Sequence, residues 1–138
     1  MTTPLPTEFT MVPSSHPRTT AERTAALERL SFGVEYTDHM ARATWTLDAG
    51  WQHHRVEGFA PLELSPAAAV FHYGQEIFEG LKAYRHADGS VWAFRPEANA
   101  RRFAASARRL AMPELPEVDF LASIRTLVEA DQIGRAHV

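Results

Sequence analysis

The sequence predicts an α+β fold in which strands paired as hairpins come first and helices follow. An Asp88-Gly89 dipeptide between two stretches with large apolar side chains is typical of a tight hairpin turn. After it, residues 96–112 and 117–130 carry apolar side chains at helical spacing, and Pro96 opens the first stretch. The length of 138 residues fits one domain of this kind.

The beginning of the chain predicts a tail followed by a short helix. Residues 1–18 contain four prolines and few large apolar side chains, so we expect an extended or mobile N-terminal tail. Thr19 and Glu22 fit a capping box, which predicts a helix that runs to about Leu30. We therefore expect the folded domain to span residues 19–132.

Two extended segments follow the first helix. Apolar and polar side chains partly alternate over residues 43–47, which predicts a strand. Turn residues occupy positions 48–50, so residues 51–56 should return as a second, antiparallel strand. Residues 61–64 should form a further extended piece.

The middle of the chain carries helix signals. Ser65 and Pro66 are typical of a helix start, with Ser as the N-cap and Pro at the first helical position. A further short helix is expected over residues 74–79, closed by Gly80.

The strands of the predicted hairpin are residues 81–85 and 90–94. Apolar side chains occur on both faces of this hairpin, so we expect it to lie inside a sheet rather than at an edge.

The last six residues, 133–138, begin no recognisable element after a well-formed helix end. They resemble the translation of a sequencing-library adapter, so we expect a non-native tail and a natural sequence that diverges after about residue 132.

Composition excludes several classes of protein. The chain has no cysteine, which rules out disulfides, cysteine-ligated metals and thiol nucleophiles. It has no apolar run long enough to span a membrane and no secretory signal, so a cytoplasmic location is the default expectation. The net charge is −3 at pH 7.

Four arginines gather on the helix that begins at Pro96: Arg101, Arg102, Arg108 and Arg109. Residues seven apart share one side of a helix, so these arginines form either a solvated basic face or a phosphate site. Arg102 lies near the positive end of the helix, which favours an anion there. Nucleic acid is a weaker hypothesis because the chain is acidic and no aromatic residues are interleaved with the arginines.

Other candidate residues have ordinary explanations as well. The histidines lack the spacing of metal ligands, so no metal site is expected. Tyr73 and Phe78 are explained by core packing or by a pocket wall. Lys82, the single lysine of the chain, is explained by a surface position or a salt bridge.

The sequence FHYGQEIFEGLKAYR over residues 71–85 closely resembles the branched-chain amino acid aminotransferases. Further matching motifs are FG at 32–33, TDHM at 37–40, ADGS at 87–90, FRP at 94–96, Asn99, Arg102, SARRLA at 106–111 and PELP at 113–116. The resemblance covers about residues 30–132. It implies the small N-terminal domain of a fold-type IV enzyme that uses pyridoxal 5'-phosphate, with an antiparallel sheet and a hairpin packed against helices.

The resemblance also implies roles for individual residues. Arg102 would hold the cofactor phosphate, while Phe32, Tyr73 and Phe78 would line the pocket for the substrate side chain. The reaction would transfer an amino group from Leu, Ile or Val to 2-oxoglutarate, as part of branched-chain amino acid metabolism, in either amino-acid biosynthesis or breakdown.

The family's Schiff-base lysine belongs to a larger C-terminal domain that this chain lacks, and Lys82 matches a non-catalytic position. The chain alone is therefore expected to be inactive. The complete protein is expected to be a homodimer that acts on small amino acids and 2-oxo acids, without nucleic-acid or membrane partners.

Two alternatives remain open. Within the same fold, a D-amino acid aminotransferase or an aminodeoxychorismate lyase would share several of these motifs. From a different class, the chain could be a free-standing anion- or nucleic-acid-binding module that uses its arginine-rich helix.

Overall fold

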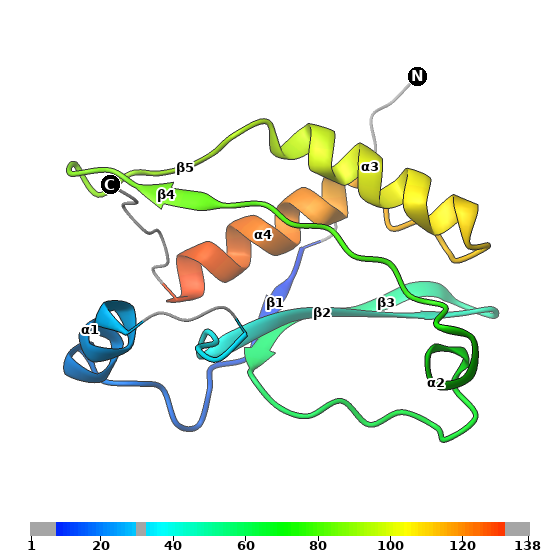
Figure 1. Ribbon diagram of the computed structural model, residues 1–138, viewed down its shortest axis with the longest axis horizontal. Helices are drawn as coiled ribbons and strands as arrows, with labels where there is room; N and C mark the ends of the chain where they lie inside the picture. Colours follow the sequence, from blue (N-terminus) through cyan, green and yellow to red (C-terminus); the bar gives the residue numbers. More distant parts are fainter. Residues whose placement is uncertain (1–7, 30–32, 132–138) are drawn as a thin grey trace.

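The computed structural model describes residues 8–29 and 33–131, and it confirms the predicted α+β fold (Figure 1). The elements in chain order are β1 (Thr10–Met11), α1 (Thr20–Glu28), β2 (His39–Thr46), β3 (Gly50–Gly58), α2 (Ala69–Tyr73), β4 (Ala83–Arg85), β5 (Val91–Ala93), α3 (Pro96–Arg109) and α4 (Glu117–Asp131). The expected tail at 133–138 lies outside the described residues.

The main sheet has three strands in the order β1-β3-β2. Strands β2 and β3 pair antiparallel, as predicted from residues 43–47 and 51–56. A register shift between Arg42 and Thr44 marks a bulge, and His53 on the opposite strand has a φ of 52° there. Such a bulge sharpens the local twist of the strand pair.

Strand β1 corrects the expectation of a mobile tail for the part of residues 1–18 that the structure describes. It pairs parallel with β3, and the backbone N–H of Val12 donates to the Val56 carbonyl at 2.8 Å. Phe9 is buried against the ring of His54, with centroids 5.1 Å apart. Sheet pairing and one buried aromatic residue order this segment, although its composition alone predicts no core contribution.

Helix α4 lies between the main sheet and α3 (Figure 1), and it contacts β2, β3 and α3. Ala100, Ala104 and Ala107 form a buried stripe on α3 at helical spacing. The rings of Phe103 and Phe120 meet across the two helices at 5.2 Å. Small side chains on α3 allow the close approach that buries this stripe.

The capping box of α1 is confirmed. The Glu22 backbone N–H donates to Thr19 Oγ1 at 3.3 Å, and the Thr19 N–H donates to a Glu22 carboxylate oxygen at 2.7 Å. The helix ends at Glu28, and the predicted end at Leu30 lies outside the described residues.

The predicted helix over residues 74–79 is wrong. Helix α2 lies earlier and ends at Tyr73, because the next residue, Gly74, adopts a left-handed φ of 57° and terminates the helix. Residues 74–82 form an irregular segment, which we call the 74–82 loop. Ser65 and Pro66 form a turn rather than the first turn of α2, which begins at Ala69.

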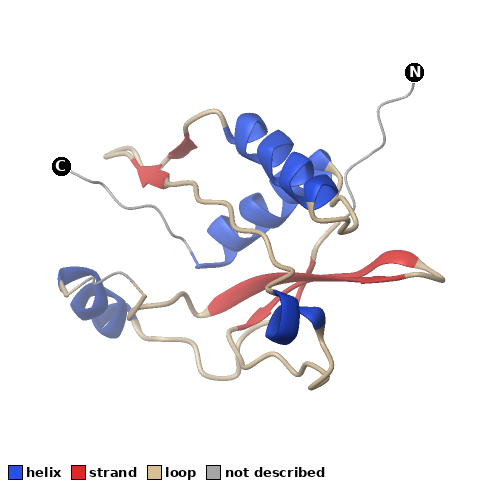
Figure 2. Cartoon of the chain, turned by 45° about the vertical axis from the view of Figure 1, so that its right-hand side comes forward, coloured by secondary structure: helices blue, strands red, loops and turns tan. Residues whose placement is uncertain are grey.

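The predicted hairpin is confirmed, but its expected place inside a sheet is wrong. Strands β4 and β5 form a two-stranded sheet of their own, set apart from the main sheet (Figure 2). The side chains of Trp92 and Phe94 are 64% and 80% exposed. The apolar side chains on both faces of the hairpin are therefore not all buried within the described part of the chain.

The last two helices match their predictions closely. Helix α3 begins at Pro96 and ends at Arg109, a little before the predicted Met112. It ends there because Ala111 has a φ of 53° and the Met112 N–H donates to the Ala107 carbonyl at 2.9 Å. These features are those of a Schellman motif.

Candidate active site

A hollow of about 500 Å³ lies between the 74–82 loop and one face of α3. We call it the α3 hollow. Its lining residues are Glu76, Ile77, Phe78, Arg102, Ala105, Ser106, Arg109 and Leu110.

The arginine and serine side chains that line the α3 hollow come from one face of helix α3. Arg102, Ser106 and Arg109 follow one another at spacings of four and three, so they share one face of α3. The buried alanine stripe occupies a different face and packs toward α4. The same helix thus anchors the domain on one side and offers hydrogen-bond donors on another.

Side-chain contacts hold the 74–82 loop against α3 at both ends of the helix. The Gln75 side-chain amide donates to the Leu110 carbonyl at 2.9 Å, at the end of the helix. The Asn99 side-chain amide donates to the Gly80 carbonyl at 2.8 Å, near its beginning. The loop is therefore tied to both ends of the helix face that it covers.

Arg102 is held by Glu79 in a two-pronged ion pair. Arg102 Nε donates to Glu79 Oε2 at 2.8 Å, and Nη2 donates to Oε1 at 2.5 Å. The hydrogen bonds from Arg102 lower the pKa of Glu79, and the same bonds raise the pKa of Arg102. Both groups are therefore charged at neutral pH, and the orientation of the guanidinium is fixed.

The α3 hollow suits an anion that carries an apolar part. Two of the five N–H donors of Arg102 are used by Glu79, which leaves donors for a ligand. Arg109 has no ion-pair partner in the described part of the chain, and Ser106 adds a hydroxyl. Ile77 and Phe78 supply apolar wall. Guanidinium and hydroxyl donors of this kind fit a phosphate group.

A second ion pair on α3 gives an internal comparison. Arg108 Nε and Nη2 donate to the two carboxylate oxygens of Glu114 at 2.8 and 2.6 Å. The pair has the same two-pronged form, yet neither residue lines the α3 hollow. Arg101 does not line it either.

The structure brings together three of the residues singled out from the sequence, Arg102, Arg109 and Phe78. Tyr73 ends α2, is 86% exposed and does not line the α3 hollow. Lys82 is exposed and does not line it. Phe32 lies outside the described residues.

Sequence reasoning missed Glu79 and Asn99 as partners in this site. Asn99 lies three residues before Arg102, so both face the same side of α3, and this spacing was a usable signal. No sequence pattern linked Glu79 to Arg102, because the helix expected over residues 74–79 gave no indication that Glu79 would contact α3.

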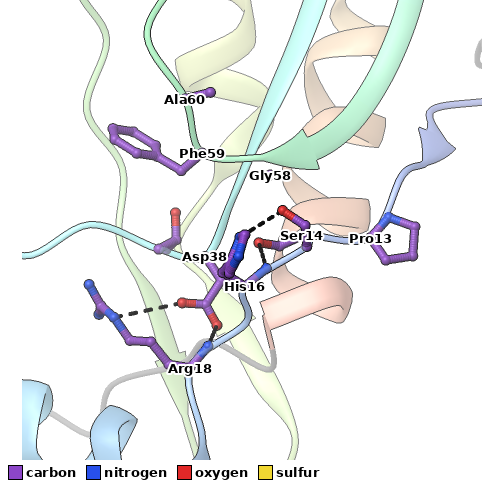
Figure 3. Close-up of a pocket in the computed structure, with 10 residues that line it drawn as sticks. Pro13, Ser14, His16, Arg18, Asp38, Gly58, Phe59 and Ala60 are labelled. Carbon is purple, nitrogen blue, oxygen red and sulfur yellow. Dashed lines mark hydrogen bonds and ion pairs between the residues drawn. The ribbon is translucent and has the colours of Figure 1, made fainter.

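A second hollow, of about 450 Å³, lies where residues 13–18 cross the ends of β2 and β3 (Figure 3). Its main charged groups are satisfied within the chain. Arg18 approaches Glu35 at 3.4 Å and Asp38 at 3.7 Å, and Arg23 donates to Asp38 at 2.8 Å. This leaves less capacity for a ligand than the α3 hollow has.

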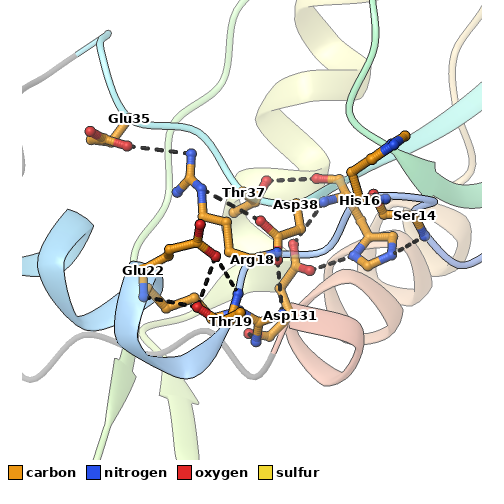
Figure 4. A network of polar contacts seen from close by, with 11 residues as sticks. Ser14, His16, Arg18, Thr19, Glu22, Glu35, Thr37, Asp38 and Asp131 are labelled. Carbon is orange, nitrogen blue, oxygen red and sulfur yellow. Dashed lines mark hydrogen bonds and ion pairs between the residues drawn. The ribbon is translucent and has the colours of Figure 1, made fainter.

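Asp131, which Figure 4 shows within a network of polar contacts, forms a buried pair with His39. The Ser14 backbone N–H donates to His39 Nε2 at 2.9 Å, so the proton lies on Nδ1, which donates to Asp131 at 2.5 Å. Serine, histidine and aspartate thus meet, but through the serine backbone and not its hydroxyl. The trio therefore lacks the nucleophile contact of a hydrolase triad, and the sequence separation of 92 residues hid the His39–Asp131 pair from sequence reasoning.

Comparisons with known proteins show which enzymes this chain is similar to. The chain is 54% identical over 127 residues to the branched-chain-amino-acid aminotransferase of Mycolicibacterium smegmatis, covering 92% of this chain and 34% of that protein. It is 51% identical over 132 residues to a probable branched-chain-amino-acid aminotransferase of Streptomyces coelicolor, covering 96% of this chain and 36% of that protein. The chain is a relative of the branched-chain-amino-acid aminotransferases.

A more distant relative, branched-chain-amino-acid transaminase 1 of Bacillus subtilis, is 46% identical over 103 residues, covering 75% of this chain and 29% of that protein. The chain thus spans about a third of the length of the curated relatives that it matches. No protein-family model matches the chain.

Within residues 8–29 and 33–131, the helices are too short or too polar to form a membrane span. No group of three or more His, Cys, Asp or Glu side chains in these ranges could hold a metal ion.

Proposed function

We propose that the chain is the N-terminal part of a branched-chain amino acid aminotransferase and that its α3 hollow holds the phosphate of pyridoxal 5'-phosphate. The observation that supports this most directly is the Arg102 side chain, which lines the α3 hollow, is 63% exposed and has its guanidinium fixed by Glu79. The identity of 54% to an aminotransferase from M. smegmatis supplies the reaction class.

The residues present fit a phosphate group. Arg102 would donate through the N–H groups that Glu79 does not use, with Ser106 and Arg109 one and two turns further along the same face. Pyridoxal phosphate, when bound, supplies the electron sink for amino-group transfer.

Aromatic side chains support a pocket for the substrate. Tyr73 and Phe78 are each 86% exposed, which is unusual for aromatic residues in a folded domain. We propose that they, together with Phe32, line the site for a Leu, Ile or Val side chain once the remaining two-thirds of the protein covers them. An apolar pocket favours such substrates over polar ones.

The α3 arginines do not favour the alternative of a nucleic-acid-binding module. Arg102 and Arg108 are each held by a carboxylate in a two-pronged pair. Two of the four arginines on this helix are therefore offset by carboxylates, and the net charge of the chain is −3, so the helix offers a polyanion little net positive charge.

The first test is cofactor binding by the complete protein that contains this chain. Arg102→Ala should raise the Kd for pyridoxal phosphate about 10- to 100-fold, as expected for loss of charge-assisted hydrogen bonds. It should leave the ranking of Leu, Ile and Val by kcat/KM unchanged. Arg108→Ala is the matched control, because Arg108 lies on the same helix in the same kind of ion pair. An unchanged Kd for Arg102→Ala would refute the phosphate assignment.

The second test uses the 138-residue chain alone. It should show no transamination of leucine with 2-oxoglutarate, because its single lysine, Lys82, does not line the α3 hollow. Turnover that is abolished by Lys82→Ala would overturn this expectation.

A further inference from the structure

Glu79 is far less exposed than the arginine it binds. Its side chain is 7% exposed, whereas that of Arg102 is 63% exposed. The ion pair therefore joins a buried carboxylate to an arginine side chain at the surface.

Other contacts hold the Glu79 carboxylate in place. The Asn99 side-chain amide donates to Glu79 Oε1 at 2.9 Å, and the Gly80 backbone N–H donates to the same oxygen at 3.0 Å. Asn99 is itself buried at the start of α3 and donates a second bond to the Gly80 carbonyl. Glu79 is thus a fixed acceptor.

A fixed acceptor restricts Arg102 before any ligand arrives. An arginine side chain has many rotamers, and binding normally costs the entropy of selecting one of them. The two-pronged bond to Glu79 defines the plane of the guanidinium and occupies Nε and one Nη2 hydrogen. The donors of Nη1 and the second Nη2 hydrogen remain for a ligand.

We propose that Glu79 is a positioning residue: held by Asn99, it orders Arg102 so that the remaining donors of the guanidinium serve a phosphate group in the α3 hollow. This inference rests on the proposed function, since it assigns the phosphate to Arg102. It makes the 74–82 loop a part of the binding apparatus and not only a connection between α2 and β4.

Glu79 could instead weaken phosphate binding, and the two roles predict opposite changes in affinity when Glu79 is removed. A carboxylate can also compete with an anion for the same guanidinium. If Glu79 competes, its removal strengthens phosphate binding; if it positions Arg102, its removal weakens binding.

The experiment measures the Kd of the complete protein for pyridoxal phosphate and for inorganic phosphate. Glu79→Gln keeps the shape of the side chain but removes its charge, and it should raise both Kd values about tenfold, the lower end of what losing an outer partner costs at metal sites. Glu114→Gln is the matched control and should change neither value by more than about twofold, because it alters an equivalent pair outside the α3 hollow. Asn99→Ala should reproduce part of the effect of Glu79→Gln.

A second measurement follows Arg102 itself by NMR in the cofactor-free protein. Its Nε–H should exchange with solvent faster in Glu79→Gln than in the unaltered protein, which a general loss of fold would not produce selectively. If Glu79→Gln does not fold, Glu79→Asp serves both measurements, with a smaller increase of Kd expected.

The outcomes separate the two proposals. Weaker binding in both Arg102→Ala and Glu79→Gln supports the positioning role. Weaker binding in Arg102→Ala with unchanged or tighter binding in Glu79→Gln overturns the positioning role alone. Unchanged binding in Arg102→Ala overturns the phosphate assignment and the positioning role with it.

Discussion

Two polar clusters of this chain each contain a buried carboxylate that accepts charge-assisted hydrogen bonds, but they differ in solvent exposure. The His39–Asp131 pair is sealed, with both side chains about 95% inaccessible, and its polar atoms bond within the chain. The Glu79–Arg102 pair is open on one side, because only its carboxylate is buried. A sealed cluster ties segments of the fold together, whereas an open one keeps donors available for a ligand.

The sealed cluster joins three distant segments. Asp131 at the end of α4 accepts from both the backbone and the ring of His39 at the start of β2. His39 in turn accepts from Ser14 of the N-terminal segment. The loss of one member should therefore affect stability, while the loss of a member of the open cluster should affect ligand affinity.

The largest expected effect on stability comes from Asp131→Ala. It should lower the free energy of unfolding by about 3–5 kcal/mol, because it leaves two buried donors of His39 without an acceptor. Asp131→Asn keeps one acceptor oxygen and should cost less. Denaturant unfolding of the chain measures both variants, and a loss under about 1 kcal/mol for Asp131→Ala would show that the cluster does not hold the fold together.

Arg23→Ala should have an intermediate effect. Arg23 of α1 donates to Asp38 at 2.8 Å and to the Asp131 carbonyl at 3.2 Å, and its side chain is 34% exposed. Partial exposure reduces the worth of such bonds, so we expect a loss of about 1–2 kcal/mol by the same unfolding measurement. Arg29→Ala on the same helix, whose side chain contacts only the Ala25 carbonyl in the described residues, is the control and should change little.

The smallest effect on stability should come from the open pair, through its dependence on pH. Arg102 lowers the pKa of Glu79 below its ordinary value of 4.5. A carboxyl group with a lowered pKa in the folded state stabilises that state above the ordinary value, and this contribution is lost as pH falls through the lowered pKa. The difference in unfolding free energy between the unaltered chain and Glu79→Gln should therefore shrink as pH is lowered below about 4.5.

Glu114→Gln supplies the control for that titration. Arg108 lowers the pKa of Glu114 in the same way, so the sign should be the same. Because both side chains of this pair are at least 40% exposed, the change should be smaller than for Glu79. A larger pH dependence for Glu114→Gln than for Glu79→Gln would contradict the expectation that the buried carboxylate of Glu79 contributes more to stability than the exposed carboxylate of Glu114.

Local signals predicted elements well where the chain interacts with itself nearby. The capping box at Thr19, the Asp88-Gly89 turn and Pro96 at the start of α3 each act through neighbouring backbone groups. These features depend on a few adjacent residues, so the sequence alone was enough to find them.

Local sequence patterns gave wrong predictions where contacts with distant segments determine the structure. The ordered segment around Phe9 depends on β3, and the 74–82 loop depends on contacts with α3. In both places composition and local periodicity predicted a different structure. The positions of Tyr73 and Lys82 relative to the α3 hollow were likewise outside the reach of local patterns.

The sequence by itself determined the fold class, the order of hairpin and helices, and the resemblance of its motifs to an aminotransferase family. It also placed Arg102 on the helix that begins at Pro96, since helix starts and spacing are local properties. Only the tertiary structure showed that Glu79 holds Arg102 and that His39 meets Asp131, because these pairs are 23 and 92 residues apart along the chain. Contacts of that length arise from packing, which local sequence rules do not encode.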